Sequence, residues 1–106
     1  MGAAQLDRAE AGNGRHRAEV RRLVVRAERR GAGIGGALLQ AVVERGRELD
    51  LRLLWLSTHD GANAERFYER LGWTRVGVIP DWAVLPSGEL VGNSFYFFRL
   101  GHLTNP

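Results

Sequence analysis

Hydrophobic and polar residues alternate over the first quarter of the chain, as is typical of β-strands. A short apolar stretch, Ala3–Leu6, precedes a longer segment, His16–Arg26, in which charged residues separate the apolar ones. A period of two suits strands that bury one face. Between the two segments lies Asn13-Gly14, a pair that favours positive φ at the tip of a hairpin. The pattern therefore predicts two antiparallel strands that meet at this tip.

The pattern then becomes helical. Arg29–Gly36 is a basic, glycine-rich turn. Beyond it, apolar residues recur at intervals of three and four and form one face, namely Ile34, Leu38, Leu39, Val42 and Val43. We expect this helix to end near Asp50. Leu51–Leu56 is almost continuously apolar, and the shortness of this run favours a buried strand.

The second half of the chain predicts a helix followed by two strands. Ser57–Gly61 is polar and predicts a loop. The next helix turns Phe67, Tyr68 and Leu71 inward. It ends at Gly72, since glycine accepts the left-handed conformation that follows many helices.

Two strands are expected to close the fold. Trp73–Ile79 predicts the first, and the aromatic run Ser94–Leu100 predicts a last strand buried on both faces. Pro80–Gly92 predicts a loop between them, with a turn at Pro86-Ser87-Gly88. The order strand, strand, helix, strand, helix, strand, strand indicates an α+β fold, in a three-layer α/β arrangement. It has a mixed sheet of about five strands and two main helices, in a single domain, residues 1–106.

Composition excludes several classes of protein. Of the 106 residues, 44% are hydrophobic and 25% charged, which is ordinary for a globular domain. No apolar run approaches the roughly 20 residues that cross a bilayer, and Met1–Glu10 lacks the apolar core of a signal peptide. We therefore expect a cytoplasmic protein with no membrane partner. The chain has no cysteine, which excludes disulfides, a thiolate nucleophile and cysteine metal sites.

Charge adds little evidence for nucleic-acid or metal binding. All 15 basic residues are arginines, spread along the chain, and the net charge is only +3. A nucleic-acid binder usually gathers its basic residues on one face, so we expect no nucleic-acid partner. His16, His59 and His102 lack the spacing of metal ligands, so we expect no metal.

The glycine-rich turn Arg29–Gly36 has the features of an anion site. The first amides of a helix have no internal partner, and the helix dipole favours negative charge there. Glycines let a phosphate approach the backbone, and Arg29 and Arg30 offer fork-shaped donors to its oxygens. A tight turn without a ligand is the alternative interpretation.

Two phosphate-binding patterns fit this turn. Gly31, Gly33 and Gly36 satisfy the dinucleotide pattern G-x-G-x-x-G. The acidic residue that this pattern requires about 20 positions later is absent from the end of the next predicted strand. Arg30, Gly33 and Gly35 satisfy R-x-x-G-x-G, which resembles the pyrophosphate loop of the GNAT acetyltransferase superfamily.

A second motif follows at the spacing that this family shows. Ala64–Trp73 resembles its hallmark of an alanine, an aromatic-tyrosine pair and leucine-glycine-aromatic. Leu23-Val24-Val25 resembles the strand whose backbone pairs with pantetheine. His16–Gly101 also resembles the acetyltransferases that give resistance to tabtoxin. The chain is thus similar to the C-terminal, acetyl-CoA-binding portion of a GNAT N-acetyltransferase.

The resemblance implies acetyl-CoA as co-substrate and assigns its contacts. The implied cofactor-binding residues are Leu23, Val24, Val25, Arg29, Arg30, Gly31, Ala32, Gly33, Ile34, Gly35, Gly36 and Asn63. Asn63 is alternatively the cap of its helix. Asp81 and Trp82 would lie in a loop near the acceptor, although Trp82 fits the core equally well.

Acetyl transfer needs a proton donor for the leaving sulfur and a base for the amine. Tyr68 matches the tyrosine that the family uses as general acid; a tyrosine of the core is the alternative. Glu19 is the expected base, unless it only pairs with an arginine on the surface, and His59 is a second candidate. Relatives with tabtoxin resistance tend to carry an acidic residue where this chain has Ser57, which weakens a mechanism with two carboxylates.

The family usually places a strand, two helices and a second strand before the point where this chain begins. The resemblance therefore predicts a domain without that part, with an exposed sheet edge that favours a homodimer. The implied acceptor is a primary amine of a small molecule, such as a toxin or an antibiotic. A fragment that binds CoA or a partner without catalysis is the alternative.

Overall fold

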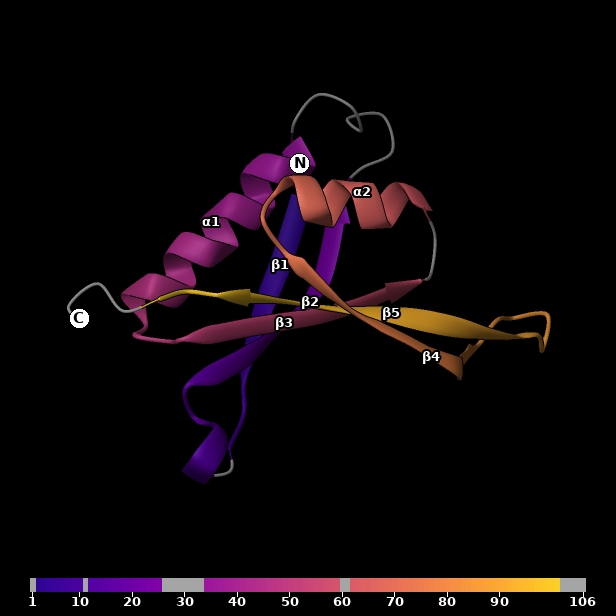
Figure 1. The fold of residues 1–106 in the computed structure, drawn as a ribbon, viewed down its shortest axis with the longest axis horizontal. Helices are drawn as coiled ribbons and strands as arrows, with labels where there is room; N and C mark the ends of the chain where they lie inside the picture. Colours follow the sequence, from indigo (N-terminus) through magenta and orange to yellow (C-terminus); the bar gives the residue numbers. More distant parts are fainter. Residues whose placement is uncertain (1, 11, 26–33, 60–61, 102–106) are drawn as a thin grey trace. The chain divides into compact units, whose positions relative to one another are not determined.

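The computed structural model describes residues 2–10, 12–25, 34–59 and 62–101. Five strands and two helices follow one another in the predicted order (Figure 1). The elements are β1 (Gly2–Arg8), β2 (Arg17–Val25), α1 (Ile34–Glu48), β3 (Leu53–His59), α2 (Ala62–Arg70), β4 (Thr74–Val84) and β5 (Leu90–Arg99), with a short 3-10 helix, η1 (Gly12–Gly14), after β1. The strands form one mixed sheet in the order β1-β2-β3-β5-β4, which confirms the predicted α+β fold.

The chain divides into two compact units, residues 1–54 with 99–106 and residues 55–98. In the first unit β1 and β2 pair antiparallel, with Leu6 opposite Val20. α1 packs on both strands. The buried apolar side chains of this unit are Ala18, Val20, Leu39, Val42, Val43, Leu51, Leu54 and Leu100.

Gly46 explains how closely α1 approaches its neighbours. A Cβ atom there would lie 3.1 Å from Cδ1 of Leu100 and 3.5 Å from the methyl groups of Leu54. The distance of 3.1 Å to Leu100 is shorter than an ordinary van der Waals contact between carbon atoms. The helix therefore tolerates a glycine in its interior because a larger residue would push it away from the core.

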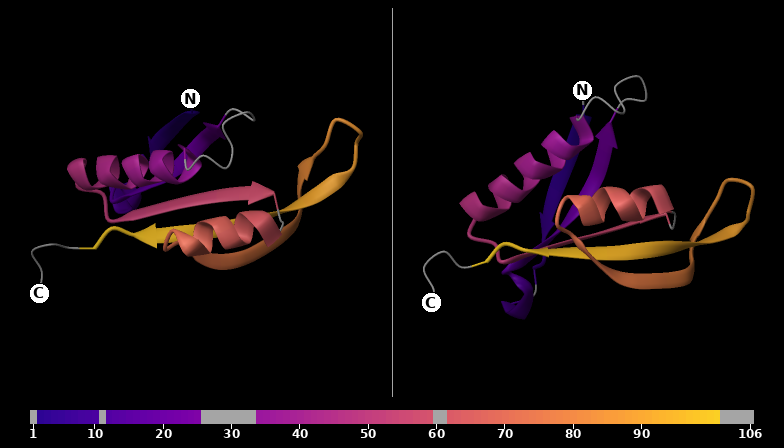
Figure 2. Two further views of the ribbon diagram at one scale, coloured as in Figure 1. Left: turned by 90° about the horizontal axis from the view of Figure 1, so that it is seen from above. Right: turned by 45° about the horizontal axis from the view of Figure 1, so that its top comes forward.

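In the second unit α2 packs against β4, and β4 pairs antiparallel with β5. The core of this unit contains the buried side chains of Leu56 of β3, Tyr68 of α2, Tyr96 of β5, and Trp73, which follows α2. The tip of the β4–β5 hairpin extends beyond the N-terminal end of α2 (Figure 2). Gly72 ends the turn after α2 with φ 95°, as predicted.

The predicted hairpin tip at Asn13-Gly14 is wrong in conformation, although the antiparallel pairing is confirmed. Both residues lie in η1, and neither has positive φ. The connection from Arg8 to Arg17 is long enough for a helical turn, so a tight two-residue tip is not needed.

Three strand boundaries also differ from the prediction. β3 runs to His59, so Ser57 to His59 is strand and not loop. β4 continues through Pro80 to Val84, and β5 begins at Leu90, which leaves only residues 85–89 as the loop. The turn at Pro86-Ser87-Gly88 is confirmed: the Gly88 amide donates to the Leu85 carbonyl at 2.8 Å.

Pro80 was a misleading loop signal because β4 is the last strand in the sheet order. An outermost strand tolerates proline where no ladder hydrogen bond is needed. The register shifts between Ile79 and Ala83, and Asp81 has φ 58°. The polar residues Ser57 to His59 predicted a loop, but they lie in β3, because a strand with one open face accommodates polar side chains.

β5 is not buried on both faces as predicted. Ser94 and Tyr96 are buried, whereas Phe95 and Phe97, which alternate with them, are partly exposed. The face that carries Ser94 and Tyr96 is turned toward α2, where Tyr96 contacts Tyr68. Within the parts of the chain that the structure describes, no helix has the length and apolarity to cross a membrane.

Candidate functional site

The first turn of α1 has the features of an anion-binding helix end. The helix begins at Ile34, with Gly35 and Gly36 in its first turn, and it has no acidic residue in that turn. Its first amides lack internal partners and lie at the positive end of the helix dipole. The two glycines add no side chain that would keep a phosphate away. This helix end therefore fits a diphosphate.

Most of the predicted cofactor loop falls outside the described residues. This applies to Arg29, Arg30, Gly31, Ala32 and Gly33. Leu23, Val24, Val25, Ile34 and Asn63 are described for their backbone only. Val24 and Val25 pair with Ala3 and Gly2 of β1. Asn63 is the second residue of α2, and its role, as a coenzyme contact or a helix cap, stays a prediction.

Tyr68 lies on α2 inside an aromatic cluster. Its side chain is 8% exposed. Its ring centre lies 4.9 Å from that of Tyr96 and 6.3 Å from that of Trp73. Burial, and then the neighbouring Tyr96, raise the pKa of the Tyr68 phenol above its ordinary value. A phenol with a raised pKa keeps its proton at neutral pH, which is the state that a proton donor needs.

A polar network behind the cluster ties α2 to the sheet. Glu65 of α2 pairs with Arg75 of β4, with Oε2 and Nε 3.4 Å apart. Arg75 lies opposite Tyr96 in the β4–β5 ladder. The Tyr96 hydroxyl is buried near Ser94 and Arg75, although its contacts with them fall outside good hydrogen-bond geometry. Sequence reasoning missed this network, because only the strand register brings Arg75 and Tyr96 together.

Burial also raises the pKa of Tyr96, and the Glu65 carboxylate adds to the increase; Arg75 and polar contact with Ser94 lower it in part. Two phenols with raised pKa values therefore lie in contact in the second unit.

Glu19 lies on β2 of the first unit, where it faces Asp7 across the β1–β2 ladder. Its carboxylate is 4.0 Å from Nε of Arg21, and Arg21 also binds Asp7 at 3.0 Å. The Glu19 side chain is 29% exposed. This is the surface pairing that the alternative interpretation of Glu19 describes, and its role as a base stays a prediction.

The end of β3 carries the other candidates. Asn93 of β5 donates from Nδ2 to Oγ of Ser57 at 3.2 Å. His59 is exposed. Trp82 is 51% exposed, lies on β4 and meets Phe95 edge-on, with ring centres 5.0 Å apart. Trp82 therefore belongs neither to a loop nor to the core. No cluster of three or more His, Asp or Glu side chains forms among the described residues.

The sequence matches a known family over most of its length. A model of the acetyltransferase (GNAT) family matches residues 1–73. The likeness to tabtoxin-resistance acetyltransferases in particular stays a prediction.

Solved acetyltransferase structures share the fold. The proposed acetyltransferase yncA from Salmonella typhimurium, solved with its cofactor acetyl-CoA, matches with a TM-score of 0.84 and 21% identity, over 99% of this chain and 61% of that one. The ribosomal-protein-alanine N-acetyltransferase from Brucella melitensis matches with a TM-score of 0.82 and 23% identity, over 92% of this chain and 60% of that one. The acetyltransferase of the GNAT family from Streptococcus pneumoniae matches with a TM-score of 0.83 and 19% identity, over 92% of this chain and 59% of that one. The chain thus spans about 60% of the length of these proteins.

Proposed function

Because the chain belongs to the GNAT acetyltransferase family, we propose that it transfers an acetyl group from acetyl-CoA to a primary amine of a small molecule. The observation that carries the proposal is the position of Tyr68, a buried and protonated phenol on the helix that bears the second family motif. A similar solved structure contains acetyl-CoA as its cofactor. Acetyl-CoA supplies the acetyl group as a thioester.

The N-terminus of α1 would hold the diphosphate of the coenzyme. The amides of Gly35 and Gly36 and the absence of an acidic residue from the first turn support this assignment. Arg29 and Arg30, which precede the helix in the sequence, would add charged donors. The backbone of Leu23-Val24-Val25 and the side chain of Asn63 would complete the proposed contacts, and a backbone amide near Val24 or Val25 would face the acetyl oxygen.

Tyr68 would donate its proton to the sulfur as the thiolate leaves. Burial raises the pKa of its phenol, so Tyr68 is protonated at neutral pH and has a proton to give as negative charge develops on the sulfur. Packing against Tyr96 and Trp73 holds the ring in one orientation. Glu19 is the proposed base, and His59 remains the competing candidate, because the Arg21 pairing gives Glu19 a structural role as well.

Replacement of Tyr68 by phenylalanine tests the proposal. Tyr68→Phe removes one hydroxyl and keeps the ring, so the fold should remain. We expect the rate of acetylation, followed by release of free CoA thiol, to fall by about 100-fold or more, as is typical for loss of a general acid. Acetyl-CoA affinity, measured by calorimetry, should change little.

Tyr96→Phe is the matched control, since it removes the same atom from the neighbouring buried ring. It should retain most of the turnover. Equal rates for Tyr68→Phe and the parent would refute the role of Tyr68. Acetyl-CoA binding without acetylation of any amine would favour a non-catalytic CoA-binding protein. Tight binding of NAD, with none of acetyl-CoA, would point to the dinucleotide pattern of the glycine-rich turn.

A further inference from the structure

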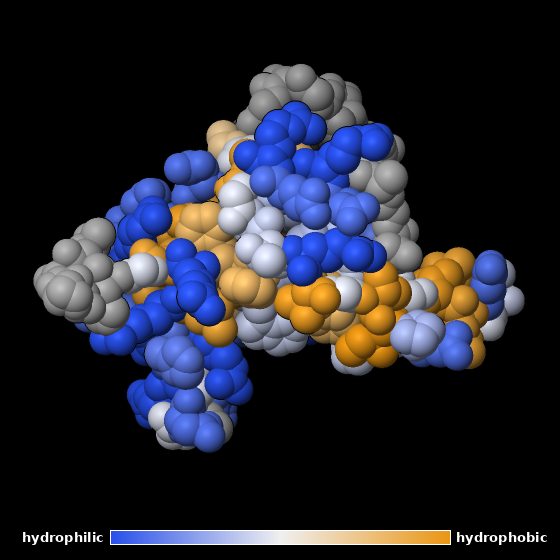
Figure 3. Space-filling model, in the orientation of Figure 1, coloured by the Kyte–Doolittle hydropathy of each residue, from blue (hydrophilic) through white to orange (hydrophobic). Residues whose placement is uncertain are grey.

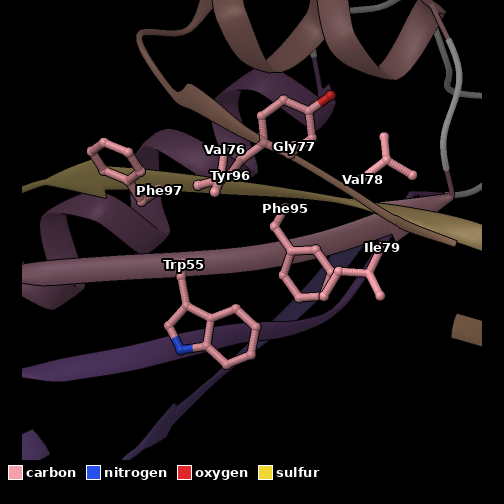
Figure 4. A pocket seen from close by; sticks show the side chains of 8 residues that line it. All are labelled: Trp55, Val76, Gly77, Val78, Ile79, Phe95, Tyr96 and Phe97. Carbon is pink, nitrogen blue, oxygen red and sulfur yellow. The ribbon is translucent and has the colours of Figure 1, made fainter.

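An apolar hollow lies in the sheet of the second unit, and three of the side chains that line it, Trp55, Phe95 and Ile79, point away from α2 (Figure 4). Its volume is about 420 Å³, and its walls come from β3, β4 and β5 (Figure 4). Tyr96 contacts Tyr68 of α2. Phe95 is next to Tyr96 on the same strand and therefore points to the opposite face. There, with Trp55 and Ile79, it lines the hollow.

The hollow has a floor of flat rings. Trp55 and Phe95 stack with ring centres 6.1 Å apart and planes at 18°. Ile79 is 44% exposed and Trp82 51% exposed beside them. Apolar side chains gather over β4 and β5 on the surface as well (Figure 3). Exposed apolar patches of this kind usually mark binding sites, and pockets of roughly 300–1,000 Å³ are the size that small molecules occupy.

Polar side chains lie next to the aromatic rings of the hollow, on the same face of β3 and β5. Ser57 follows Trp55 by two residues on β3, and Asn93 precedes Phe95 by two on β5, so all four side chains share one face. Asn93 and Ser57 hydrogen-bond to each other at 3.2 Å. His59 continues the same row on β3. At about 3.3 Å of rise per residue, the row from Trp55 to His59 is roughly 13 Å long. A molecule with a ring at one end and a polar group at the other would match it.

We propose that this hollow binds the aromatic part of the acceptor, and that the acceptor class is therefore arylalkyl primary amines. The identification of the ligand as the acceptor rests on the proposed function. The ring of the amine lies against Trp55, Phe95 and Ile79, and its amino group lies toward Ser57, Asn93 and His59. A simple alkylamine lacks the ring and gains nothing from the hollow.

Two amines that differ only by a ring test the proposal. The ratio of kcat/KM for 2-phenylethylamine to that for ethylamine is measured in the parent, in Ile79→Glu and in Val84→Glu. Both substitutions place a carboxylate on an exposed position of β4, but Val84, 67% exposed, lies outside the hollow. Because both amines carry the same charge, the ratio cancels the electrostatic effect of the new carboxylate.

We expect the parent to favour 2-phenylethylamine by about 20-fold, as burial of a phenyl ring allows. The ratio should approach one in Ile79→Glu and stay unchanged in Val84→Glu. A parent ratio near one, or a ratio that Ile79→Glu leaves intact, overturns the proposal.

Binding is also measured by calorimetry with 2-phenylethanol, a neutral probe that cannot be acetylated at nitrogen. If neither amine is acetylated, the proposed function fails, whereas binding of this probe that is lost only in Ile79→Glu still supports an aromatic site. No binding to the parent overturns the site. A parent dimer that Ile79→Glu dissociates would show that a second copy covers the hollow, and it would overturn the proposal too.

Discussion

Tyr68 and Tyr96 are the only tyrosines of the chain, and their rings lie 4.9 Å apart. Burial raises the pKa of both. The contact therefore serves two purposes. It orients the proposed acid, and it surrounds each phenol with apolar atoms that disfavour the phenolate.

The same contact makes the fold sensitive to alkali. The unfolded chain ionises its phenols near pH 10.0, and the folded chain ionises them only at higher pH. Protonated phenols thus stabilise the folded state fully below pH 10, and this stabilisation is lost as the pH rises toward the folded pKa values. We expect the urea midpoint to fall steadily above about pH 10.

The alkaline loss can be assigned to these residues, because the chain contains no lysine and no cysteine that would titrate nearby. Tyr96→Phe should show a smaller loss than the parent, with phenolate absorbance recorded on the same samples. An identical pH dependence in parent and variant would contradict the assignment.

The sequence reveals the motif around Tyr68 but not the contacts among Glu65, Arg75 and Tyr96. Tyr68 could be singled out from the sequence because the residues around it form a local pattern that resembles the family motif. Glu65, Arg75 and Tyr96 could not, because they come from three elements and meet only through the pairing of β4 with β5. No periodicity within one element carries that information.

At the scale of elements, the sequence predicts the identity of each helix and strand well and their ends less well. Periodicity distinguishes α1 from the strands because it repeats over several turns, whereas the prediction of α2 rests on its inward aromatic pair and on Gly72. Strand ends depend on what the neighbouring strand provides. His59 and Pro80 lie within strands because β3 and β4 find hydrogen-bond partners in the sheet, or need none there.

The junction of α2 and β4 offers a test at this scale. Gly72 adopts φ 95°, and an added Cβ would lie 3.4 Å from Cε2 of Phe98. Gly72→Ala should therefore cost about 1 kcal/mol of unfolding free energy, from the left-handed backbone. Urea unfolding measures the loss.

Gly12→Ala is the control for Gly72→Ala. Gly12 has no positive φ, and nothing lies within 4 Å of its added Cβ. Its replacement should leave the free energy of unfolding within about 0.5 kcal/mol of the parent. Equal losses at both positions would show that the backbone of Gly72 is not the cause.

At the scale of the molecule, a chain of 106 residues has little stability to spare. Leu54 is 0% exposed, and its methyl groups approach Gly46 of α1. Leu54→Ala should reduce the free energy of unfolding by roughly 3 kcal/mol. For a domain of this size that corresponds to a fall in Tm on the order of 10–20 °C.

Val84→Ala serves as the reference for Leu54→Ala, because Val84 is 67% exposed. Calorimetry of both variants should show a large fall in Tm for Leu54→Ala and almost none for Val84→Ala. Similar falls for the two would mean that the core does not depend on Leu54.

The interruption of β4 at Pro80 and Asp81 has a consequence for crowded solutions. This outermost strand carries Val76 and Val84, both largely open to water, and such a border invites fibre growth. Pro80 supplies no N–H, and the left-handed Asp81 turns the backbone out of line. The free edge of β4 therefore offers an incoming chain two short rows of backbone hydrogen-bonding groups and not one continuous row. The interruption therefore lowers the tendency of this strand to pair with further chains, although its side chains are apolar.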